Sequence, residues 1–189
     1  DCYHILFDRS PNPMWVYDRE TLAFLAVNES MSSHYGYSRE ELLGGMTIKE
    51  IRPKEKIPEL LRQYETTIKV AEPSTGLRAG GVWEHKKKDG TRIKVDVSWA
   101  SIPFEGRPAI LAFGTDVTDQ LASEAALDRS EDRFAKIFRA SPVGISITAL
   151  DDSRFLDVND RFVQLHGWTR EELIGRSSEG IFEWVEPRD

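Results

Sequence analysis

The chain has 189 residues, of which 40% are hydrophobic and 30% charged, a composition typical of folded globular proteins. Its formal net charge is −7, which disfavours a nucleic-acid-binding surface because such surfaces are usually basic. No apolar run approaches the ~18 residues of a membrane span, and no signal peptide is present. Cys2 is the only cysteine, so we expect no disulfide or cysteine-rich metal site and a reducing, cytoplasmic location. Because the sequence does not begin with Met, we expect it to be part of a longer chain.

The first 28 residues predict a short helix followed by a β-hairpin. Residues 1–10 combine apolar and polar side chains in a pattern typical of a short amphipathic helix that ends near Ser10. Residues 13–18 and 22–28 are apolar runs separated by a polar turn, which predicts two antiparallel strands.

Capping residues then predict two short helices. Asn28 is a good N-cap for the first helix, and Gly36 ends it. Ser38 and Glu41 stand three residues apart, the spacing of a capping box for the second helix, which Gly44 ends.

A longer helix is predicted next. After a single helical turn closed by Pro53, four apolar residues recur at spacings of four, three and four and so define one helix face: Ile57, Leu61, Tyr64 and Ile68. Residues 71–81 have the composition of a loop.

Three further strands follow. The pair Asp89-Gly90 separates two alternating segments and predicts a hairpin with a type I′ turn. In the second segment four side chains share one strand face: Ile93, Val95, Val97 and Trp99. Residues 109–118 predict the last strand. The total is five antiparallel strands, with the small helices between the second strand and the third.

Residues 119–140 contain no Gly or Pro and predict a linker helix with a loose apolar seam, made of Leu121, Leu127, Phe134, Ile137 and Phe138. Such a seam is typical of a helix that pairs with another helix. The alternative is a helix that folds back on its own domain.

An internal repeat sets the domain plan. Residues 24–44 return at 155–175 with a constant offset of 131 positions, and the capping signals return with them. Two copies of one structural unit follow from this repeat. The second copy runs from Phe138 to Asp189 and lacks the last three strands, so we expect either continuation of the chain or completion of the sheet from elsewhere.

The order of elements resembles the PAS domain, a sensory module of signalling proteins. The motifs that carry the resemblance are S-P-x-P, V-N-E-S, G-Y-S-R-E-E-L-L-G, W-E-H-K-K-K-D-G-T and the closing G-T-D-V-T-D. The resemblance implies an α+β fold with sheet order 2-1-5-4-3 and helices over one face. It divides the chain into a first PAS domain (1–118, with a helical cap at 1–10), a linker helix (119–137) and the N-terminal part of a second PAS domain (138–189).

The cofactor signatures of the family are missing. The stretch G-M-T-I-K-E-I-R-P has no cysteine where flavin photosensors of the LOV type carry one, and residues 57–70 contain no histidine for haem. Covalent flavin and histidine-ligated haem are therefore disfavoured, whereas non-covalent flavin or a small organic ligand is open. No two histidines lie at metal-ligand spacing, and no catalytic motif is present.

A pocket is expected between the sheet and the helices, although most aromatic residues there could equally fill the core. The candidates are Trp15, Asn28, Met31, Tyr35, Ile51, Leu61, Tyr64, Trp99 and Phe113. Asn28 has an alternative role as an N-cap. Asp116 and Thr118 resemble the family's D-I-T element and are expected to relay a signal into the linker helix, where Thr118 or Asp119 could also be the cap.

The resemblance implies a sensory relay module in a multidomain bacterial protein, with a sensor histidine kinase as the favoured parent. Its output domain would lie outside these residues, and a homodimer would form through the linker helix and the N-terminal helix. The alternatives are a dimerisation scaffold without a ligand and the input region of a cyclic-dinucleotide enzyme. An enzyme with a PAS-like fold and a DNA-binding regulator are less well supported.

Overall fold

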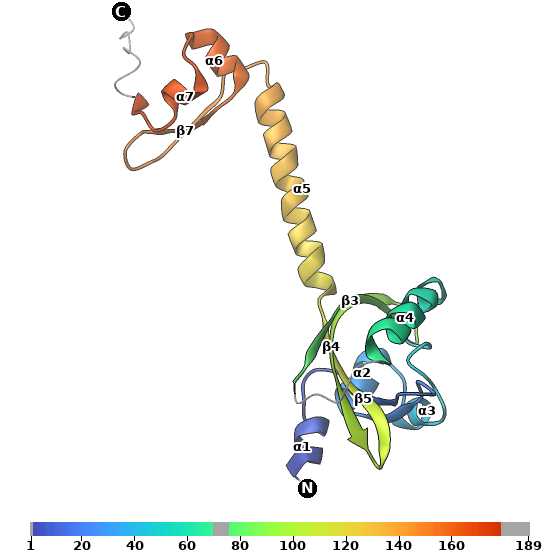
Figure 1. Cartoon of the computed structure of the whole chain (residues 1–189). Helices are drawn as coiled ribbons and strands as arrows, with labels where there is room; N and C mark the ends of the chain where they lie inside the picture. Colours follow the sequence, from blue (N-terminus) through green and yellow to red (C-terminus); the bar gives the residue numbers. More distant parts are fainter. Residues whose placement is uncertain (1, 70–75, 179–189) are drawn as a thin grey trace, which may run out of the picture. The chain divides into compact units, whose positions relative to one another are not determined.

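The computed structural model describes residues 2–69 and 76–178 and divides the chain into two compact units, Asp1–Ala122 and Ser123–Asp189. The helices and strands of the first unit are shown in Figure 1. They are α1 (Cys2–Asp8), β1 (Met14–Asp18), β2 (Phe24–Val27), α2 (Glu29–Tyr35), α3 (Arg39–Leu43), η1 (Lys54–Lys56), α4 (Ile57–Gln63), η2 (Tyr64–Ile68), β3 (Arg78–Lys86), β4 (Arg92–Phe104) and β5 (Arg107–Asp116). Helix α5 (Thr118–Ala140) follows.

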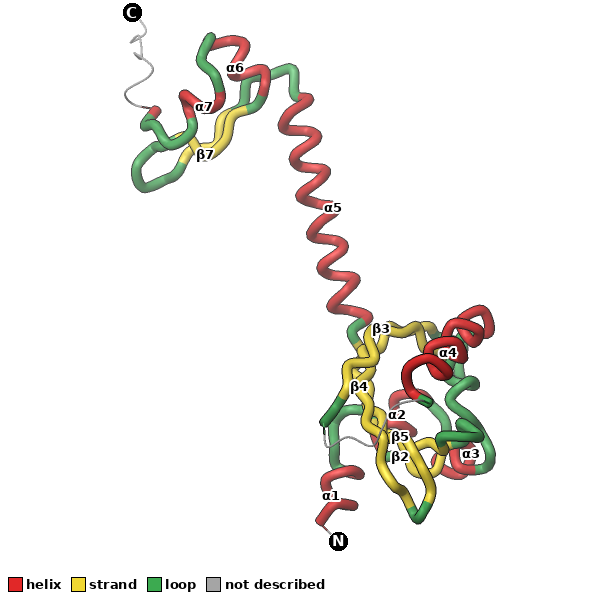
Figure 2. Tube along the Cα trace, in the orientation of Figure 1, coloured by secondary structure: helices red, strands yellow, loops and turns green. Residues whose placement is uncertain are grey.

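The five strands form one antiparallel sheet in the order β2-β1-β5-β4-β3, as predicted. Trp15 pairs with Val27 on one side and with Ala112 on the other, which places β1 between β2 and β5. Helices α3 and α4 lie on one side of the sheet (Figures 1 and 2). The predicted PAS architecture is therefore confirmed.

The hydrophobic core fills the space between the sheet and these helices. The predicted inner face of β4 is confirmed, since Ile93, Val95, Val97 and Trp99 are all buried. They belong to one cluster with side chains from α2, α3 and α4, among them Met31, Tyr35, Leu42 and Leu60. Burial of this apolar face, rather than helix propensity, holds the short helices in place.

The predicted face of the longer helix is wrong at Leu61. Leu60 is 3% exposed, whereas Leu61 is only partly buried against the core. The physical reason is a π-helical turn, η2, in which the Lys69 N–H donates to the Tyr64 carbonyl five residues back at 2.8 Å. The wider turn keeps Tyr64 and Ile68 buried in line with Leu60 rather than Leu61.

The hairpin between β3 and β4 is confirmed, but its type I′ turn is wrong. A type I′ turn needs a positive φ at both central residues. Only Gly90 has one (φ 91°). The Gly90 N–H donates to the Lys87 carbonyl at 3.0 Å, and Asp89 accepts from the Thr91 N–H instead. The connection is thus a turn with a positive-φ glycine at its end.

The predicted caps are confirmed in both copies. The Asn28 side chain accepts from the Met31 N–H at 2.9 Å, and Asn159 accepts from the Phe162 N–H at 2.9 Å. Ser38 with Glu41, and Thr169 with Glu172, form complete capping boxes. These local signals fix where each short helix begins.

Asn28 makes three further hydrogen bonds besides the cap. Its Oδ1 also accepts from the Met14 N–H at 2.9 Å, and its Nδ2 donates to the carbonyls of Phe7 (3.1 Å) and Asn12 (2.9 Å). The side chain is buried, with the residue 1% exposed. One amide thus joins the end of α1, the following loop, the start of β1 and the start of α2.

The second unit repeats the first half of this plan. It contains β6 (Ser146–Thr148), β7 (Phe155–Val158), α6 (Asp160–His166) and α7 (Arg170–Leu173), with β6 and β7 paired as an antiparallel hairpin. A small core is made by Phe155, Val158, Phe162 and Leu173. The predicted partial second unit is confirmed, and residues 179–189 of that prediction lie outside the described residues.

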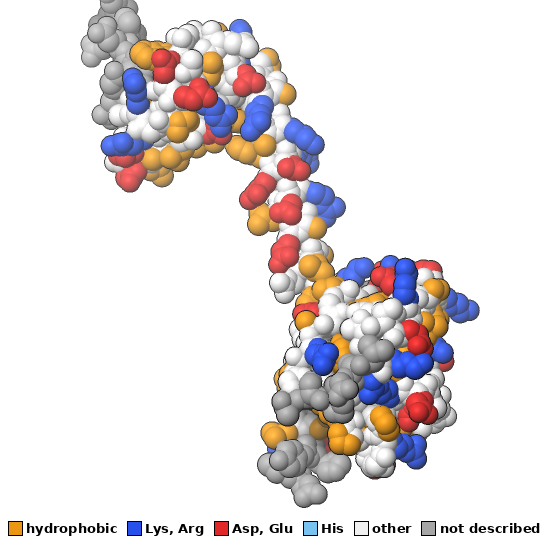
Figure 3. All heavy atoms as spheres, viewed as in Figure 1, with side chains coloured by type: hydrophobic (Ala, Val, Ile, Leu, Met, Phe, Trp, Pro, Cys, Tyr) orange, Lys and Arg blue, Asp and Glu red, His pale blue; other side chains and the backbone are white. Residues whose placement is uncertain are grey.

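Helix α5 leaves part of its apolar seam exposed. Leu127, Phe134 and Ile137 are each about 60% exposed, and Phe138 is buried. On the face of α5 seen in Figure 3, charged side chains of both signs lie beside apolar ones. Within residues 2–69 and 76–178, no helix combines the length and the apolar composition needed to cross a bilayer.

We predict that Asn28→Ala lowers the free energy of unfolding of the first unit by about 3 kcal/mol, because the cap is lost and the partly buried Met14 N–H and Phe7 carbonyl lose their partner. Chemical denaturation followed by tryptophan fluorescence measures the loss. Ser38→Ala, which removes an exposed cap, is the matched control with a loss of about 1 kcal/mol. Equal losses for the two variants would contradict the central role of Asn28.

Candidate functional site

A small cavity lies between the sheet and the α4–η2 segment. Its volume is about 30 Å³, room for about two water molecules. The residues that line it are Trp15, Tyr17, Ile48, Arg52, Leu60, Gln63, Ile68, Gly80, Trp83, Val97, Trp99 and Ala112. The cavity therefore has largely aromatic and aliphatic walls with one charged side chain.

That charged side chain, Arg52, is almost completely buried, with the residue 5% exposed. Its guanidinium lies over the Trp83 ring, with Cζ 5.5 Å from the ring centroid. Its Nε and Nη1 atoms are buried and have no hydrogen-bond partner among the described residues. Burial lowers the pKa of Arg52 to about 10, so the group still carries its charge at neutral pH. No pattern in the sequence predicted this, because arginine is rarely buried without a partner.

Only some of the nine predicted pocket residues line the cavity. Trp15 and Trp99 line the cavity. Five others are buried in the core without lining it, namely Asn28, Met31, Tyr35, Ile51 and Tyr64. Leu61 is replaced by Leu60 at the cavity wall. Phe113 is placed on the wrong face of the sheet: Ala112 lines the cavity, and side chains of adjacent strand residues point to opposite faces. Contact of any of these residues with a ligand stays a prediction.

Beside the cavity, Tyr35 and His85 form a buried polar pair. The Tyr35 hydroxyl lies 2.6 Å from His85 Nδ1, and His85 is 0% exposed. Burial raises the pKa of Tyr35, so the phenol stays neutral and can donate to Nδ1. His85 Nε2 is buried and has no partner among the described residues. The pair links α2 to β3.

Asp116 lies at the joint between β5 and α5. His34 Nε2 lies 2.9 Å from Asp116 Oδ2, and the Thr118 N–H and hydroxyl donate to Oδ1 at 3.0 Å and 2.5 Å. Burial alone would raise the pKa of Asp116, but the hydrogen bonds from Thr118 and the nearby His34 lower it below its usual value. Asp116 therefore caps the first N–H of α5 while it holds α2.

Thr118 has a different role from the predicted cap. Its hydroxyl donates to Asp116 and accepts from the Lys94 N–H at 2.8 Å, so it attaches the start of α5 to the first residues of β4. The position of Asp116 and Thr118 at the strand-to-helix joint agrees with the expectation from the D-I-T element. Their part in relaying a signal is a proposal.

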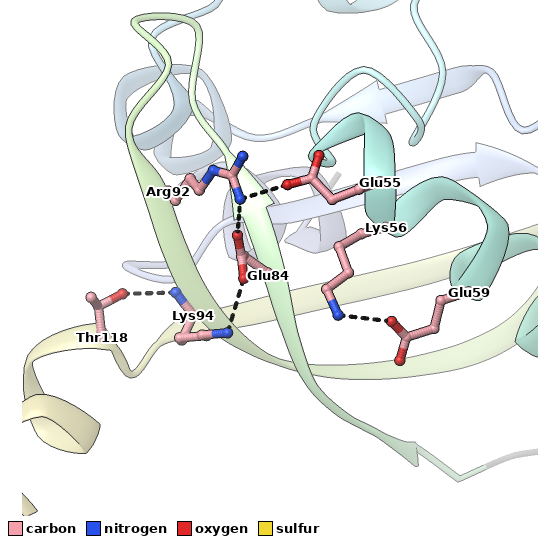
Figure 4. A network of polar contacts seen from close by, with 7 residues as sticks. All are labelled: Glu55, Lys56, Glu59, Glu84, Arg92, Lys94 and Thr118. Carbon is pink, nitrogen blue, oxygen red and sulfur yellow. Dashed lines mark hydrogen bonds and ion pairs between the residues drawn. The ribbon is translucent and has the colours of Figure 1, made fainter. Parts of the chain in front are cut away.

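A surface chain of charges continues from this joint to η1 (Figure 4). Glu84 binds Lys94 at 3.1 Å and Arg92 at 2.9 Å, and Arg92 also binds Glu55 of η1 at 2.7 Å. Hydrogen bonds from Lys94, followed by those from Arg92, lower the pKa of Glu84. The segment that follows Arg52 is thus connected to Thr118, at which α5 begins, through the side chains of Arg92, Glu84 and Lys94 and the backbone N–H of Lys94.

In the part of the chain that the structure describes, no cluster of three or more His, Cys, Asp or Glu side chains could hold a metal ion. The polar side chains that do contact one another include the Tyr35–His85 pair and the Asp116 joint, and Arg52 is buried without a hydrogen-bond partner for its Nε and Nη1 atoms among the described residues.

We predict that Tyr35→Phe lowers the free energy of unfolding by about 1–2 kcal/mol, because His85 then loses its hydrogen bond inside the core. Tyr37→Phe, at a partly buried position, is the control and should change stability by less than about 0.5 kcal/mol. Urea denaturation of the two variants measures the difference. If Tyr35→Phe is neutral, the buried pair does not contribute to folding.

Comparison with known proteins agrees with this geometry. A family model described as PAS fold matches residues 3–117, and a second described as PAS domain matches residues 132–189. The methyl sulfide methyltransferase-associated sensor of Methanosarcina acetivorans is 24% identical over 184 residues, which cover 88% of this chain and 18% of that protein.

Two solved structures share the fold. The PAS domain of an HTR-like protein from Haloarcula marismortui is 23% identical, with a TM-score of 0.50 over 61% of this chain and 88% of that one. The PAS domain of a protein from Colwellia psychrerythraea is 18% identical, with a TM-score of 0.53 over 62% of this chain and 96% of that one. The first unit has the five-stranded sheet and the short helices over one of its faces, and a family model matches it over residues 3–117. The chain therefore belongs to the PAS family of sensory domains.

Proposed function

We propose that this chain is a sensory relay module of a multidomain signal-transduction protein. In this proposal, occupancy of the first PAS unit by a small ligand or a partner changes how α5 is held. The carrying observation is the Asp116 joint, where one carboxylate binds both His34 of α2 and the first N–H of α5. A movement of α2 would therefore reach α5 through a single side chain.

The favoured parent protein is a sensor histidine kinase, whose output domain would lie outside these residues. One supporting likeness is a domain of a sensory box sensor histidine kinase/response regulator from Geobacter sulfurreducens, which shares the fold at 21% identity. The Methanosarcina relative is also named as a sensor. Input to a cyclic-dinucleotide enzyme is the alternative parentage. Under either parentage the chain itself has a regulatory rather than a catalytic role.

The energetics of relay set a condition on the ligand. A ligand shifts the balance between two arrangements of α5 only by the difference between its affinities for them. Side chains that hold α5 in one of these arrangements are therefore expected to make or lose contacts when the ligand binds. Asp116 and Thr118 meet this description, because their side chains make contacts at the start of the helix, where the Thr118 hydroxyl also accepts from the backbone N–H of Lys94.

We predict that Asp116→Ala uncouples input from output in the parent protein, because the contact between α2 and α5 is lost. The first unit should stay folded, since Asp116 lies at the rim of the sheet rather than in the core. The measurement is the output activity of the full-length protein with and without its stimulus, and the fold is checked by circular dichroism.

Asp128→Ala, which removes an exposed carboxylate from the same helix, is the matched control and should stay regulated. Normal regulation of the Asp116→Ala protein would refute the relay.

A second candidate function, a dimerisation scaffold without a ligand, is favoured by the small volume of the cavity. In that case pairing through the exposed apolar residues of α5 would be the main role of the module. The same pairing is expected for a sensory relay, so dimerisation alone does not separate the two functions. Ligand-dependent stabilisation of the first unit does.

We predict that Leu127→Lys raises the dissociation constant of an α5-mediated dimer at least about tenfold, because a charge replaces an apolar side chain at the seam. Sedimentation velocity over a concentration series measures this constant. Arg129→Ala is the control, because Arg129 follows Leu127 by two positions and therefore lies on the opposite side of the helix. An unchanged constant for Leu127→Lys would show that α5 does not pair through this face.

A further inference from the structure

We propose that the first PAS unit binds a small monocarboxylate, with Arg52 as its anchor in the cavity. This inference rests on the proposed sensory function and names the chemical class of its ligand. It is carried by three observations: a buried guanidinium with free nitrogens, a cavity that this group lines, and the lack of a compensating negative charge among residues 2–69 and 76–178.

The first step concerns the charge. A buried ion is strongly unfavourable unless it is paired or hydrogen-bonded. None of the ion pairs among the described residues involves Arg52. Tyr17 and Tyr35 are the nearby groups that could become negative, but burial raises the pKa of each phenol, so both are neutral at physiological pH. The positive charge of Arg52 is therefore uncompensated.

The second step concerns the ligand's charge and shape. Among the described residues that line the cavity, Arg52 is the only one with a charged side chain, so a single negative charge balances it and a dianion would leave one charge unpaired. A guanidinium presents donors in a planar fork that matches a carboxylate. Tyr17 and Gln63 add polar groups to the lining, and Trp15, Trp83 and Trp99 supply apolar walls. A carboxylate on a short apolar group fits this arrangement.

The third step concerns size and consequence. A cavity of about 30 Å³ suits an anion such as formate, and a larger acid requires the wall to move outward. Leu60, Gln63 and Ile68 make this wall and belong to α4 and the π-helical turn η2, and such turns occur frequently at functional sites. Arg52 also lies two residues before η1, whose Glu55 begins the surface charges that lead to Thr118 (Figure 4). Anchoring a carboxylate would act on the lid and on this connection.

The experiment is a thermal unfolding series on the 189-residue chain with sodium formate and sodium acetate as probes. Ionic strength is held constant with sodium gluconate, whose anion is too large for the cavity. We expect a saturable rise of about 5 °C in the midpoint of the first unit, with quenching or enhancement of tryptophan fluorescence because Trp83 stacks on Arg52. Formamide, which is similar in size but uncharged, should give no rise.

Arg52→Met removes the charge but keeps much of the side-chain volume. This variant should lose the anion-dependent rise and be at least as stable as the unsubstituted chain without anion, because an unpaired buried charge has been removed. Arg62→Met, at an exposed position of α4, should keep the full rise. Arg52→Lys retains a charge without the fork and should bind formate at least about tenfold more weakly.

A non-saturable or absent rise in the unsubstituted chain would overturn the proposal, and so would an equal rise in Arg52→Met. The outcome is separate from that of the relay. If formate does not bind but Asp116→Ala uncouples output, the relay stands and the anion site falls. If formate binds and Asp116→Ala stays normally regulated, the anion site stands and the relay falls.

Discussion

One buried amide, that of Asn28, connects the elements on which the first unit depends. Its two acceptor and two donor bonds reach α1, the following loop, β1 and α2. The capacity of an amide side chain, two bonds accepted and two donated, is thereby used completely, and no aliphatic residue could replace it without leaving backbone groups of these elements unpaired. Asn159 makes the corresponding four bonds, each to a residue 131 positions further on, including Phe138 in place of Phe7.

This correspondence gives α5 a defined role at each of its ends. At its start, Thr118 and Asp116 attach the helix to the sheet of the first unit. Near its end, the Phe138 carbonyl accepts from Asn159 at 2.9 Å, as the Phe7 carbonyl at the end of α1 accepts from Asn28. The last turns of α5 thus occupy in the second unit the place that α1 occupies in the first. In the relay that we propose, these polar attachments are the contacts through which a movement would enter and leave α5.

The features that could be predicted are those encoded by local chemistry. Caps such as Asn28, strand alternation in β4 and the repeat all depend on neighbouring residues, and each was found where expected. The errors arose where tertiary structure decides. A π-helical turn exchanges Leu61 for Leu60, and the pairing of β5 with both its neighbours decides that Phe113 faces away from the cavity. The burial of Arg52 and His85 had no signal, since each is a single polar residue in an otherwise ordinary segment.

The buried charge of Arg52 bears on the choice between a packed scaffold and a ligand-binding core. Replacing a buried ion by an apolar residue of similar volume is often neutral or stabilising, so stability alone gives no reason for an arginine at position 52. The neighbouring Trp83 ring offsets only part of the cost of burial, because a cation–π contact is worth about 0.5–2 kcal/mol. A cavity beside an incompletely satisfied guanidinium is instead the arrangement expected of a site whose remaining partner comes and goes.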